Sequence, residues 1–318
     1  MNILTIKNLN LCFKSNDKLY QALHNVNLEL KEGEMLAIVG ESGCGKTITA
    51  MSILQLLAPN AIITSGEIIY KDKNLLSLTQ KELENIRGKE IALIPQDPMT
   101  SLNPLYTIGS QLLEVIEIHQ GLKGKEAEER AIEVLEKVKI PNAKERLKSY
   151  PHEFSGGMRQ RVIIAMAIAC NSKIIIADEP TTALDVTVQA QIMDLLKEIQ
   201  KDFKTSFIFI SHDFGLVSET ADKVAVMYAG HVVEKSTAKD LFKTPKHPYT
   251  QALLKALPNF NTTELNPIDG QPPSIKDCFE GCTFEPRCTK RMDICKNNQP
   301  KENEIGNCKV SCWLYKKE

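Results

Sequence analysis

Short apolar runs alternate with amphipathic segments along most of the chain. Residues 4–13 and 26–30 alternate as strands do, and the run MLAIVG at 35–40 is apolar throughout, which is typical of a strand buried on both faces of a parallel sheet. Further apolar runs lie between helical stretches, at residues 91–94, 174–177, 207–210 and 224–227. This pattern predicts an α/β protein built around a largely parallel sheet.

The pattern changes between residues 97 and 161, where every periodic segment is helical. Residues 108–119 and 125–138 carry apolar side chains at helical spacing, and another helix begins within FSGGMRQR at 154–161. We predict a helical subdomain inserted into the α/β core over about residues 97–161.

After about residue 234 the chain changes character again. Two short helical segments, KDLF and HPYTQALLKAL, precede a proline-rich connector and a tail that holds six of the nine cysteines. We predict a main domain over residues 1–234 and a C-terminal extension over 235–318, with the tail as a separate unit.

The composition is that of an ordinary globular protein, with 42% hydrophobic and 25% charged residues among 318. A formal net charge of −1 gives no overall basic field that would attract nucleic acid or anionic lipid. The apolar run VIIAMAIAC at 162–170 is far shorter than the roughly 20 residues that span a bilayer. The N-terminus lacks the pattern of a cleaved signal peptide. We expect a cytosolic chain that does not itself cross a membrane.

The segment GESGCGKT follows the buried strand at 35–40 and opens a helix at 46–57. Its form, GxxxxGK[ST], predicts a phosphate-binding loop, since glycines let backbone N–H groups and the helix N-terminus surround a phosphate. Lys46 would reach the β- and γ-phosphates, and the Thr47 hydroxyl would ligate Mg²⁺. The alternative is an ordinary glycine-rich turn. The candidate positions are Gly40, Ser42, Gly43, Cys44, Gly45, Lys46 and Thr47.

Cys44 lies inside this loop. Its expected role is to fill a serine-sized slot, although a thiol near a helix N-terminus can have a lowered pKa.

Polar residues follow several of the apolar runs. Asp178 and Glu179 end the run KIIIADEP, where the first could hold Mg²⁺ through water and the second could polarise an attacking water. Gln96, Asp185 and His212 also follow apolar runs and could face the same phosphates. Taken singly, each of these three could be a cap or a turn residue.

With these segments identified, the sequence strongly resembles the ATP-binding cassette (ABC) ATPases, the motor subunits of ABC transporters. Over about residues 4–234, six motifs match in order: GESGCGKT as Walker A, IPQD as Q-loop, FSGGMRQR as signature, IIIADEP as Walker B, ALD as D-loop and SHD as switch histidine. The resemblance implies an α/β P-loop fold of ABC type with an antiparallel β subdomain, besides the helical subdomain and the small Cys-rich extension.

The resemblance also implies roles for single residues. Glu179 resembles the general base, His212 the sensor that orients water and γ-phosphate, and Gln96 the link between Mg²⁺ and the helical subdomain. Asp185 resembles the residue that couples the two sites of a dimer. Phe13 resembles the aromatic side chain that stacks on adenine, although a strand residue could equally belong to the core.

In this family the signature closes on ATP held by the Walker A loop of a partner, in a head-to-tail dimer. At a helix start, Ser155, Gly156 and Gly157 offer a hydroxyl, backbone N–H groups and the positive end of a dipole to a γ-phosphate. The alternative, a serine cap with glycines for close packing, explains one glycine better than two. Phe154 and Met158 stand where the family commonly has leucine and glutamine.

The segments KHPYTQALLKALP and GCTFEPRC resemble the C-terminal extension of the oligopeptide, dipeptide and nickel importer ATPases. This implies the ATP- and Mg²⁺-dependent motor of a peptide importer, peripheral on the cytoplasmic face of the membrane. Its implied partners are a second ATPase, identical or related, two transmembrane permeases and an extracytoplasmic substrate-binding protein. The permeases would insert a cytoplasmic helix into a groove between the α/β core and the helical subdomain.

Other functions are compatible with parts of the sequence. The extension does not separate peptide importers from nickel or metal-chelate importers. A soluble ABC protein of DNA repair or translation is disfavoured by the single cassette, the missing coiled-coil insertion and the near-neutral charge. A redox-sensing regulator, in which ATP is structural, would retain its function after Glu179→Gln.

The cysteine tail suggests metal, because stable disulfides are not expected in the cytosol. Its spacing lacks the close CxxC pairs of common zinc folds. In this importer group similarly placed cysteines are associated with a four-iron iron–sulfur cluster, and the corresponding ligands are Cys282, Cys288, Cys295 and Cys312. Zinc or unligated thiols are the alternatives, with Cys278 and Cys308 as substitute ligands.

Overall fold

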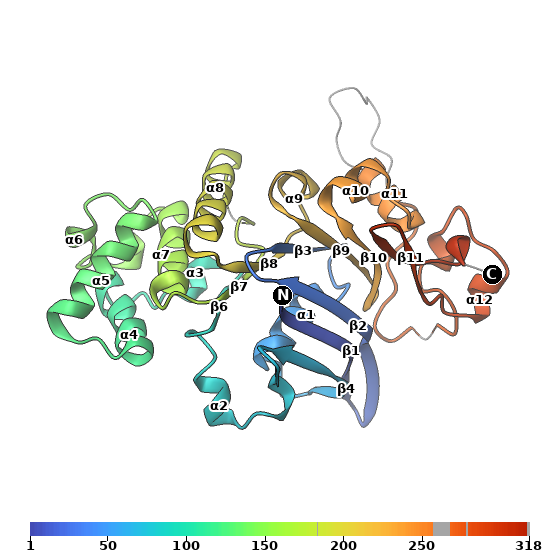
Figure 1. The fold of residues 1–318 in the computed structure, drawn as a ribbon, viewed down its shortest axis with the longest axis horizontal. Coiled ribbons are helices and arrows are strands. Elements are labelled where there is room, and N and C mark those ends of the chain that lie inside the picture. The colour runs from blue at the N-terminus through green and yellow to red at the C-terminus, as the bar shows by residue number, and fades with distance from the viewer. Residues whose placement is uncertain (183, 257–267, 278, 317–318) are drawn as a thin grey trace. The chain divides into compact units, whose positions relative to one another are not determined.

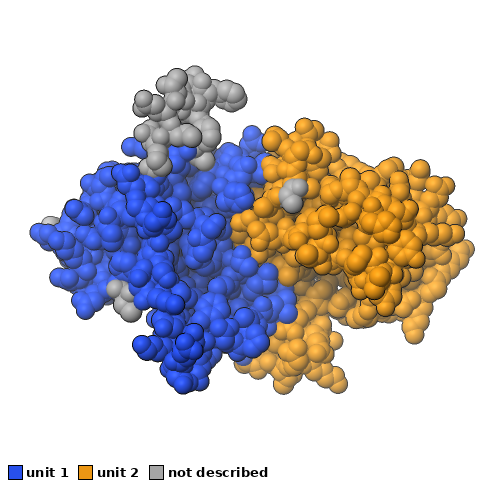
Figure 2. Space-filling model, turned by 180° about the vertical axis from the view of Figure 1, so that it is seen from behind, with its two compact units in different colours: residues 1–30, 36–76, 211–318 blue, residues 31–35, 77–210 orange. Residues whose placement is uncertain are grey.

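The computed structural model describes residues 1–182, 184–256, 268–277 and 279–316. These residues form two compact units, which Figure 2 colours separately. Unit 1 contains residues 1–30, 36–76 and 211–318, and unit 2 contains residues 31–35 and 77–210.

Unit 1 holds an antiparallel sheet with the strand order β2-β1-β4-β5. Its inward-facing apolar side chains, such as Leu9 and Leu11, are fully buried. Phe13, near the end of β1, pairs with Ala61 at the start of β4. The implied antiparallel subdomain is therefore present; its strands are β1 (Asn2–Ser15), β2 (Lys18–Lys31), β4 (Ala61–Tyr70) and β5 (Lys73–Asn74).

Five further strands of unit 1 follow the order β11-β12-β10-β9-β3. The parallel pair β3 and β9 is buried along nearly its whole length, as the apolar runs predicted. The tail, expected as a separate unit, instead adds its hairpin to this sheet through the pairing of Glu234 with Val310. The strands are β3 (Met35–Val39), β9 (Lys223–Tyr228), β10 (His231–Thr237), β11 (Glu302–Ile305) and β12 (Cys308–Ser311).

The helices of unit 1 are short (Figure 1). The first begins at Lys46 as predicted but ends at Leu54, before residue 57, because Gln55 adopts a left-handed conformation with φ of 51°. The helices are α1 (Lys46–Leu54), α9 (Phe214–Thr220), α10 (Ala238–Lys243), α11 (Pro248–Lys255) and α12 (Ile294–Asn297), with 3-10 turns at Glu285–Arg287 and Trp313–Tyr315.

Unit 2 contains three parallel strands in the order β8-β7-β6, and they confirm three of the predicted apolar runs. The strands are β6 (Ile91–Ile94), β7 (Ile174–Asp178) and β8 (Ser206–Ile210). Two long helices, α7 (Gly156–Ala169) and α8 (Val186–Phe203), accompany them. The polar residues Asp178 and Glu179 thus lie where β7 ends.

Residues 97–161 of unit 2 are helical, as predicted. In α5 the buried residues follow helical spacing, at Ala127, Ala131, Val134 and Leu135, and α5 packs against both α4 and α7. The helices of this segment are α3 (Pro98–Ser101), α4 (Ile108–Gln120), α5 (Gly124–Lys137) and α6 (Ala143–Arg146), with a 3-10 turn at Pro151–Glu153. A small helix, α2 (Gln80–Glu84), and a 3-10 turn, Leu75–Ser77, precede β6. No helix within the described ranges is long and apolar enough to cross a bilayer.

Candidate active site

The predicted phosphate loop connects β3 to α1 in a conformation that needs glycine. Gly40 and Gly45 have φ angles of 148° and 105°. A Cβ atom at Gly40 would collide with the carbonyl oxygen of Met227, and one at Gly45 would lie 2.8 Å from Cδ2 of Leu23. Backbone sterics and close packing therefore both select glycine at these two positions.

Lys46 lies near the end of this loop and is the first residue of α1. Its side chain is buried, with 6% exposed area, and its Nζ donates to the carbonyl oxygens of Gly40 at 2.9 Å and Glu41 at 3.0 Å. These contacts hold an ammonium group next to the loop's backbone, where a phosphate would be surrounded by N–H groups.

Cys44 is a packing residue of the loop. It is 5% exposed, and burial raises the pKa of its thiol. The possibility of a lowered pKa is therefore wrong, because desolvation outweighs the nearby positive charge of Lys46. This burial agrees with the prediction that the Cys44 side chain fills a small slot in the loop.

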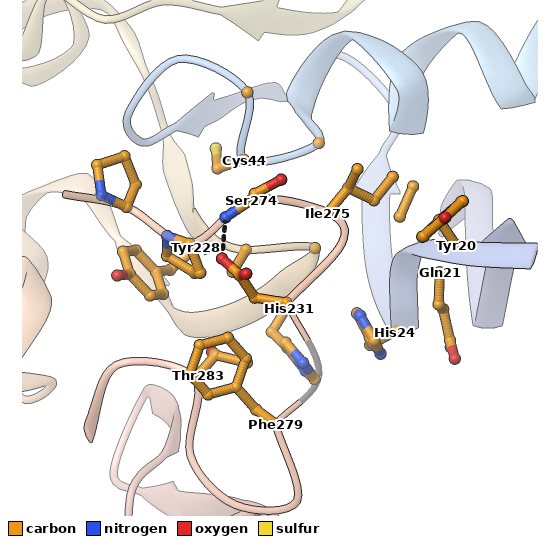
Figure 3. Close-up of a pocket in the computed structure, with 18 of the residues that line it drawn as sticks. Tyr20, Gln21, His24, Cys44, Tyr228, His231, Ser274, Ile275, Phe279 and Thr283 are labelled. Atoms are coloured by element: carbon orange, nitrogen blue, oxygen red, sulfur yellow. Dashed lines mark hydrogen bonds between the residues drawn. The ribbon is translucent and has the colours of Figure 1, made fainter. Parts of the chain in front are cut away.

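A cavity of about 810 Å³ opens beside the phosphate loop, entirely within unit 1. This volume lies in the usual range for small-molecule sites. Figure 3 shows Cys44, Tyr20, His24, His231 and Ile275 among its lining residues. The predicted positions Phe13, Ser42, Gly43, Cys44 and Gly45 line it as well. A nucleoside next to this loop would therefore meet aromatic side chains.

Sequence reasoning missed other lining residues of the cavity. These include Tyr20 of β2 and Ile48 of α1, and residues 272–275 of the proline-rich connector line the same space. Phe279 and Thr283 complete this part of the wall. Aromatic character could have pointed to Tyr20, but no local pattern points to the connector, which lies more than 200 positions after the loop.

A second group of polar residues gathers in unit 2 at the end of β7. The Glu179 Oε2 atom accepts from Nε2 of Gln96 at 3.0 Å and from Oγ1 of Thr182 at 2.9 Å. Asp178, immediately before, is 3% exposed. The structure thus brings together Gln96 and Glu179, which are 83 positions apart.

Asp185 and His212 have different local surroundings. Asp185 is the N-cap of α8, where its Oδ1 accepts from the Val188 N–H at 3.0 Å. His212 follows β8 and is exposed, and the next residue, Asp213, caps α9. His212 belongs to unit 1 and Glu179 to unit 2, so the shared phosphate site predicted for them stays a prediction.

The signature forms the first turn of α7. Ser155 is exposed and caps the helix, accepting from the Met158 N–H at 3.3 Å. A Cβ atom at Gly157 would lie 2.6 Å from Cγ1 of Val188, whereas one at Gly156 would make an ordinary 3.5 Å contact. Close packing therefore explains why position 157 is glycine, but it does not explain the glycine at position 156.

The unusual phenylalanine of the signature is a core residue. Phe154 is 3% exposed, and the Arg146 guanidinium lies 5.4 Å from the centre of its ring. Its side chain is buried and contacts Arg146, so the replacement of leucine leaves the exposed Ser155 unaffected.

The tail brings four predicted ligands around one small cavity of about 10 Å³, whose lining includes Cys282, Cys288, Cys295 and Cys312. Burial raises the pKa of Cys282 to about 12, and the neighbouring thiols add to the shift. Within the described ranges, no group of three or more His, Cys, Asp or Glu side chains is placed to hold a metal ion. Cys308 lies elsewhere, 3.5 Å from Oε1 of Glu234, and Cys278 falls outside the described residues.

Comparison with known families now defines the class of protein. The ABC transporter family matches residues 23–182, and the oligopeptide/dipeptide transporter C-terminal region matches residues 233–295. The chain belongs to the ABC transporter ATPases, as the ordered motifs indicated, and it is an ATP-binding subunit with ATPase chemistry coupled to transport.

Individual relatives cover nearly the whole chain. It is 49% identical to the dipeptide transport ATP-binding protein DppD of Bacillus subtilis, over 98% of this chain and 94% of that protein. It is 48% identical to the oligopeptide transport ATP-binding protein OppD of Salmonella typhimurium, over 94% and 90%. Among solved structures, the dimeric ATP-binding cassette MJ0796 bound to ADP and Pi aligns with a TM-score of 0.66 at 31% identity, over 74% of this chain and 98% of that one.

Proposed function

We propose that this chain is the ATP-hydrolysing motor of an ABC importer that takes up oligopeptides or dipeptides across the cytoplasmic membrane. The observation that carries this proposal is the match of residues 233–295 to the oligopeptide/dipeptide transporter C-terminal region, behind the match of residues 23–182 to the ABC transporter family. The similarity to DppD and OppD over almost the entire length supports the same substrate class.

The sequence motifs give these residues their roles in the proposed nucleotide chemistry. The phosphate loop and Lys46 bind the β- and γ-phosphates, and Phe13 stacks on the base. Mg²⁺ would be held by Thr47, Asp178 and Gln96, hard oxygen donors suited to this ion, and would neutralise charge on the phosphates.

Glu179 acts as the general base in this proposal. The two hydrogen bonds to its Oε2 orient the carboxylate, which would accept a proton from the attacking water. His212 orients that water and the γ-phosphate. Hydrolysis then removes the phosphate that holds the closed state together.

The exposed signature turn supports a head-to-tail dimer. Ser155, Gly156 and Gly157 would bind the γ-phosphate on the Walker A loop of a second ATPase, identical or related, and Asp185 would couple the two sites. Gly156, whose small size close packing does not explain, fits a close approach of phosphate to the backbone.

The remaining partners would be two transmembrane permeases and an extracytoplasmic substrate-binding protein, which place the chain peripherally on the cytoplasmic face of the membrane. Large apolar side chains are exposed in unit 2 close to the Q-loop: Leu105 at 81%, Tyr106 at 57% and Met99 at 56%. Exposed apolar side chains of this kind suit contact with an apolar permease helix.

ATP hydrolysis by the co-purified complex with its binding protein tests the transported substrate. We expect di- or oligopeptides to stimulate hydrolysis and nickel chelates to have no effect. Stimulation by nickel chelates alone would replace the peptide assignment by a metal importer. If no permease co-purifies and the chain binds DNA or ribosomes, the transporter assignment fails.

For the tail, the proposal includes an iron–sulfur cluster held by Cys282, Cys288, Cys295 and Cys312. Four thiols around one cavity are the donor set that such a cluster uses. Within the described ranges these side chains are not placed to hold a metal ion, so the thiols would have to rearrange around a cluster. Iron analysis and visible absorbance of anaerobically purified protein test this, and iron-free, colourless protein would exclude the cluster.

A further inference from the structure

An arginine of the Cys-rich tail forms an ion pair with the phosphate loop. Nη1 of Arg287 lies 2.7 Å from Oε2 of Glu41, and Nη2 lies 3.0 Å from Oε1. The Arg287 side chain is 5% exposed and that of Glu41 is 24% exposed. Two parallel charge-assisted hydrogen bonds, largely shielded from water, make this pair stronger than a typical surface salt bridge.

Glu41 is the second residue of the phosphate loop, and each of its polar groups has a partner. Its carbonyl oxygen accepts from Nζ of Lys46 at 3.0 Å. Its backbone N–H donates to Oη of Tyr249 at 2.9 Å, and Tyr249 is fully buried in α11. The loop is therefore fixed at Glu41 by the tail, by α11 and by the phosphate-binding lysine.

The tail around Arg287 is packed rigidly enough to position the guanidinium. Nε of Arg287 donates to the carbonyl of Asp269 at 3.0 Å, and Nη1 donates to Oη of Tyr228 at 3.3 Å. The Phe284 ring lies 5.2 Å from that of Tyr228 and 5.3 Å from that of Tyr249. Aromatic packing of this kind holds the 3-10 turn that carries Arg287 against the sheet.

Residues just before this turn line the nucleotide cavity. Ile275 and Phe279 are apolar but 42% and 39% exposed, and both line the cavity shared with Phe13 and Gly43 (Figure 3). A bound nucleoside would cover apolar surface that is otherwise in contact with water.

The charge of Glu41 makes Arg287 important for a polyphosphate. An unpaired carboxylate in the loop would repel the phosphates that Lys46 attracts, and the partial shielding from water would strengthen that repulsion. The Arg287 guanidinium compensates this negative charge. Its two hydrogen bonds also prevent free rotation of the Glu41 side chain.

We propose that the C-terminal extension is part of the nucleotide site of its own chain. Arg287 positions the phosphate loop and neutralises Glu41. Ile275 and Phe279 form a second wall of the nucleoside pocket. This inference rests on the proposed binding of ATP at the Walker A loop. Because the coupling is reciprocal, nucleotide binding in turn stabilises the packed state of the tail.

Titration of the full chain with a fluorescent ATP analogue tests the role of Arg287. Arg287→Ala should weaken binding about tenfold, the loss expected when a charge-assisted pair is broken and one charge is left behind. Glu41→Gln in the Arg287→Ala background should restore most of the affinity, because it removes the uncompensated charge. Arg291→Ala, which removes an exposed arginine of the same tail, should bind like the wild type.

The rescue separates this role from a purely structural one, since a damaged tail would not be repaired by a change in the loop. Arg287→Lys keeps the positive charge but loses the two parallel hydrogen bonds, so it provides the test if Arg287→Ala does not fold. Its affinity for the ATP analogue should lie between that of the wild type and that expected for Arg287→Ala. Wild-type affinity in folded Arg287→Ala or Arg287→Lys, or the absence of rescue, would overturn the proposal.

Competition with inorganic tripolyphosphate tests the nucleoside wall. Ile275→Ser should weaken ATP binding several-fold and leave tripolyphosphate binding unchanged, whereas Arg287→Ala should weaken both ligands. If Ile275→Ser and the wild type bind ATP with equal affinity, the connector is not part of the nucleoside pocket.

Lys46→Ala distinguishes failure of this inference from failure of the proposed function. If the wild type binds ATP and Lys46→Ala does not, but Arg287→Ala binds normally, the inference fails and the motor assignment stands. If the wild type binds no nucleotide, both fail.

Discussion

Glu179 combines an unusual backbone conformation with a fixed carboxylate. Its φ is +45°, in a region that costs a side-chain-bearing residue about 1–3 kcal/mol. The conformation turns the chain at the end of β7 so that Oε2 meets both Gln96 and Thr182. Strain at this residue is thus accompanied by a defined orientation of the group assigned as general base.

Glu179→Gln should retain ATP binding and lower the hydrolysis rate by about a hundredfold or more, because the amide cannot accept the proton of the attacking water. The measurement is steady-state phosphate release alongside nucleotide affinity. Glu198→Gln is a matched control, since Glu198 is an exposed residue of α8 that pairs with Lys139 at 2.7 Å. Intact function in Glu179→Gln would instead favour the regulator hypothesis, in which ATP is structural.

Among the elements of unit 1, β2 and β10 contact each other through two histidines. The rings of His24 and His231 are stacked, with centroids 4.3 Å apart and an interplanar angle of 9°. Burial, followed by the charge of His24, lowers the pKa of His231 to about 3, and burial lowers the pKa of His24. The Gln299 amide lies 3.1 Å from Nδ1 of His231. The two strands are therefore joined by neutral imidazoles.

Acid should destabilise this junction. Since the folded-state pKa of His231 is below its unfolded value of 6.5, the unfolded chain binds the additional proton, and stability falls as the pH drops below about 6.5 toward 3. The free energy of unfolding should decrease by up to about 1.4 kcal/mol per pH unit for this histidine.

Urea unfolding between about pH 7 and pH 5 measures this slope. His231→Gln should have a shallower pH profile than the wild type, whereas the same change at the exposed His152 should leave the profile as it is. A wild-type profile that stays flat below pH 6 would contradict the prediction.

At the scale of the whole molecule, each compact unit holds part of the chemistry. Unit 1 contains the phosphate loop, the cavity, His212 and the C-terminal extension, whereas unit 2 contains Gln96, Asp178, Glu179 and the signature. Within unit 1 the extension contacts the cassette through the pairing of β12 with β10 and through hydrogen bonds that include Arg287 on Glu41 and Gln299 on His231. A tail that is distinct in composition is thus continuous in structure with the nucleotide site.

Local sequence determined the parts of this protein that are contiguous along the chain. An apolar strand, a glycine-rich loop and a helix start define the phosphate site because their geometry depends on neighbouring residues. The same holds for the carboxylates that end β7 and for Ser155 as a helix cap, and the order of these motifs was enough to identify the family.

Only the tertiary structure decided which distant residues meet. Nothing near Glu41 indicates that its partner lies 246 positions later, and nothing near Cys44 indicates that burial raises its pKa. The pairing of the tail hairpin with β10 could not be predicted from local sequence either, because an exposed sheet edge can pair with any strand of suitable length. The physical reason is that backbone conformation follows from local sterics and periodicity, whereas ion pairs, burial and strand order depend on packing between segments far apart in the sequence.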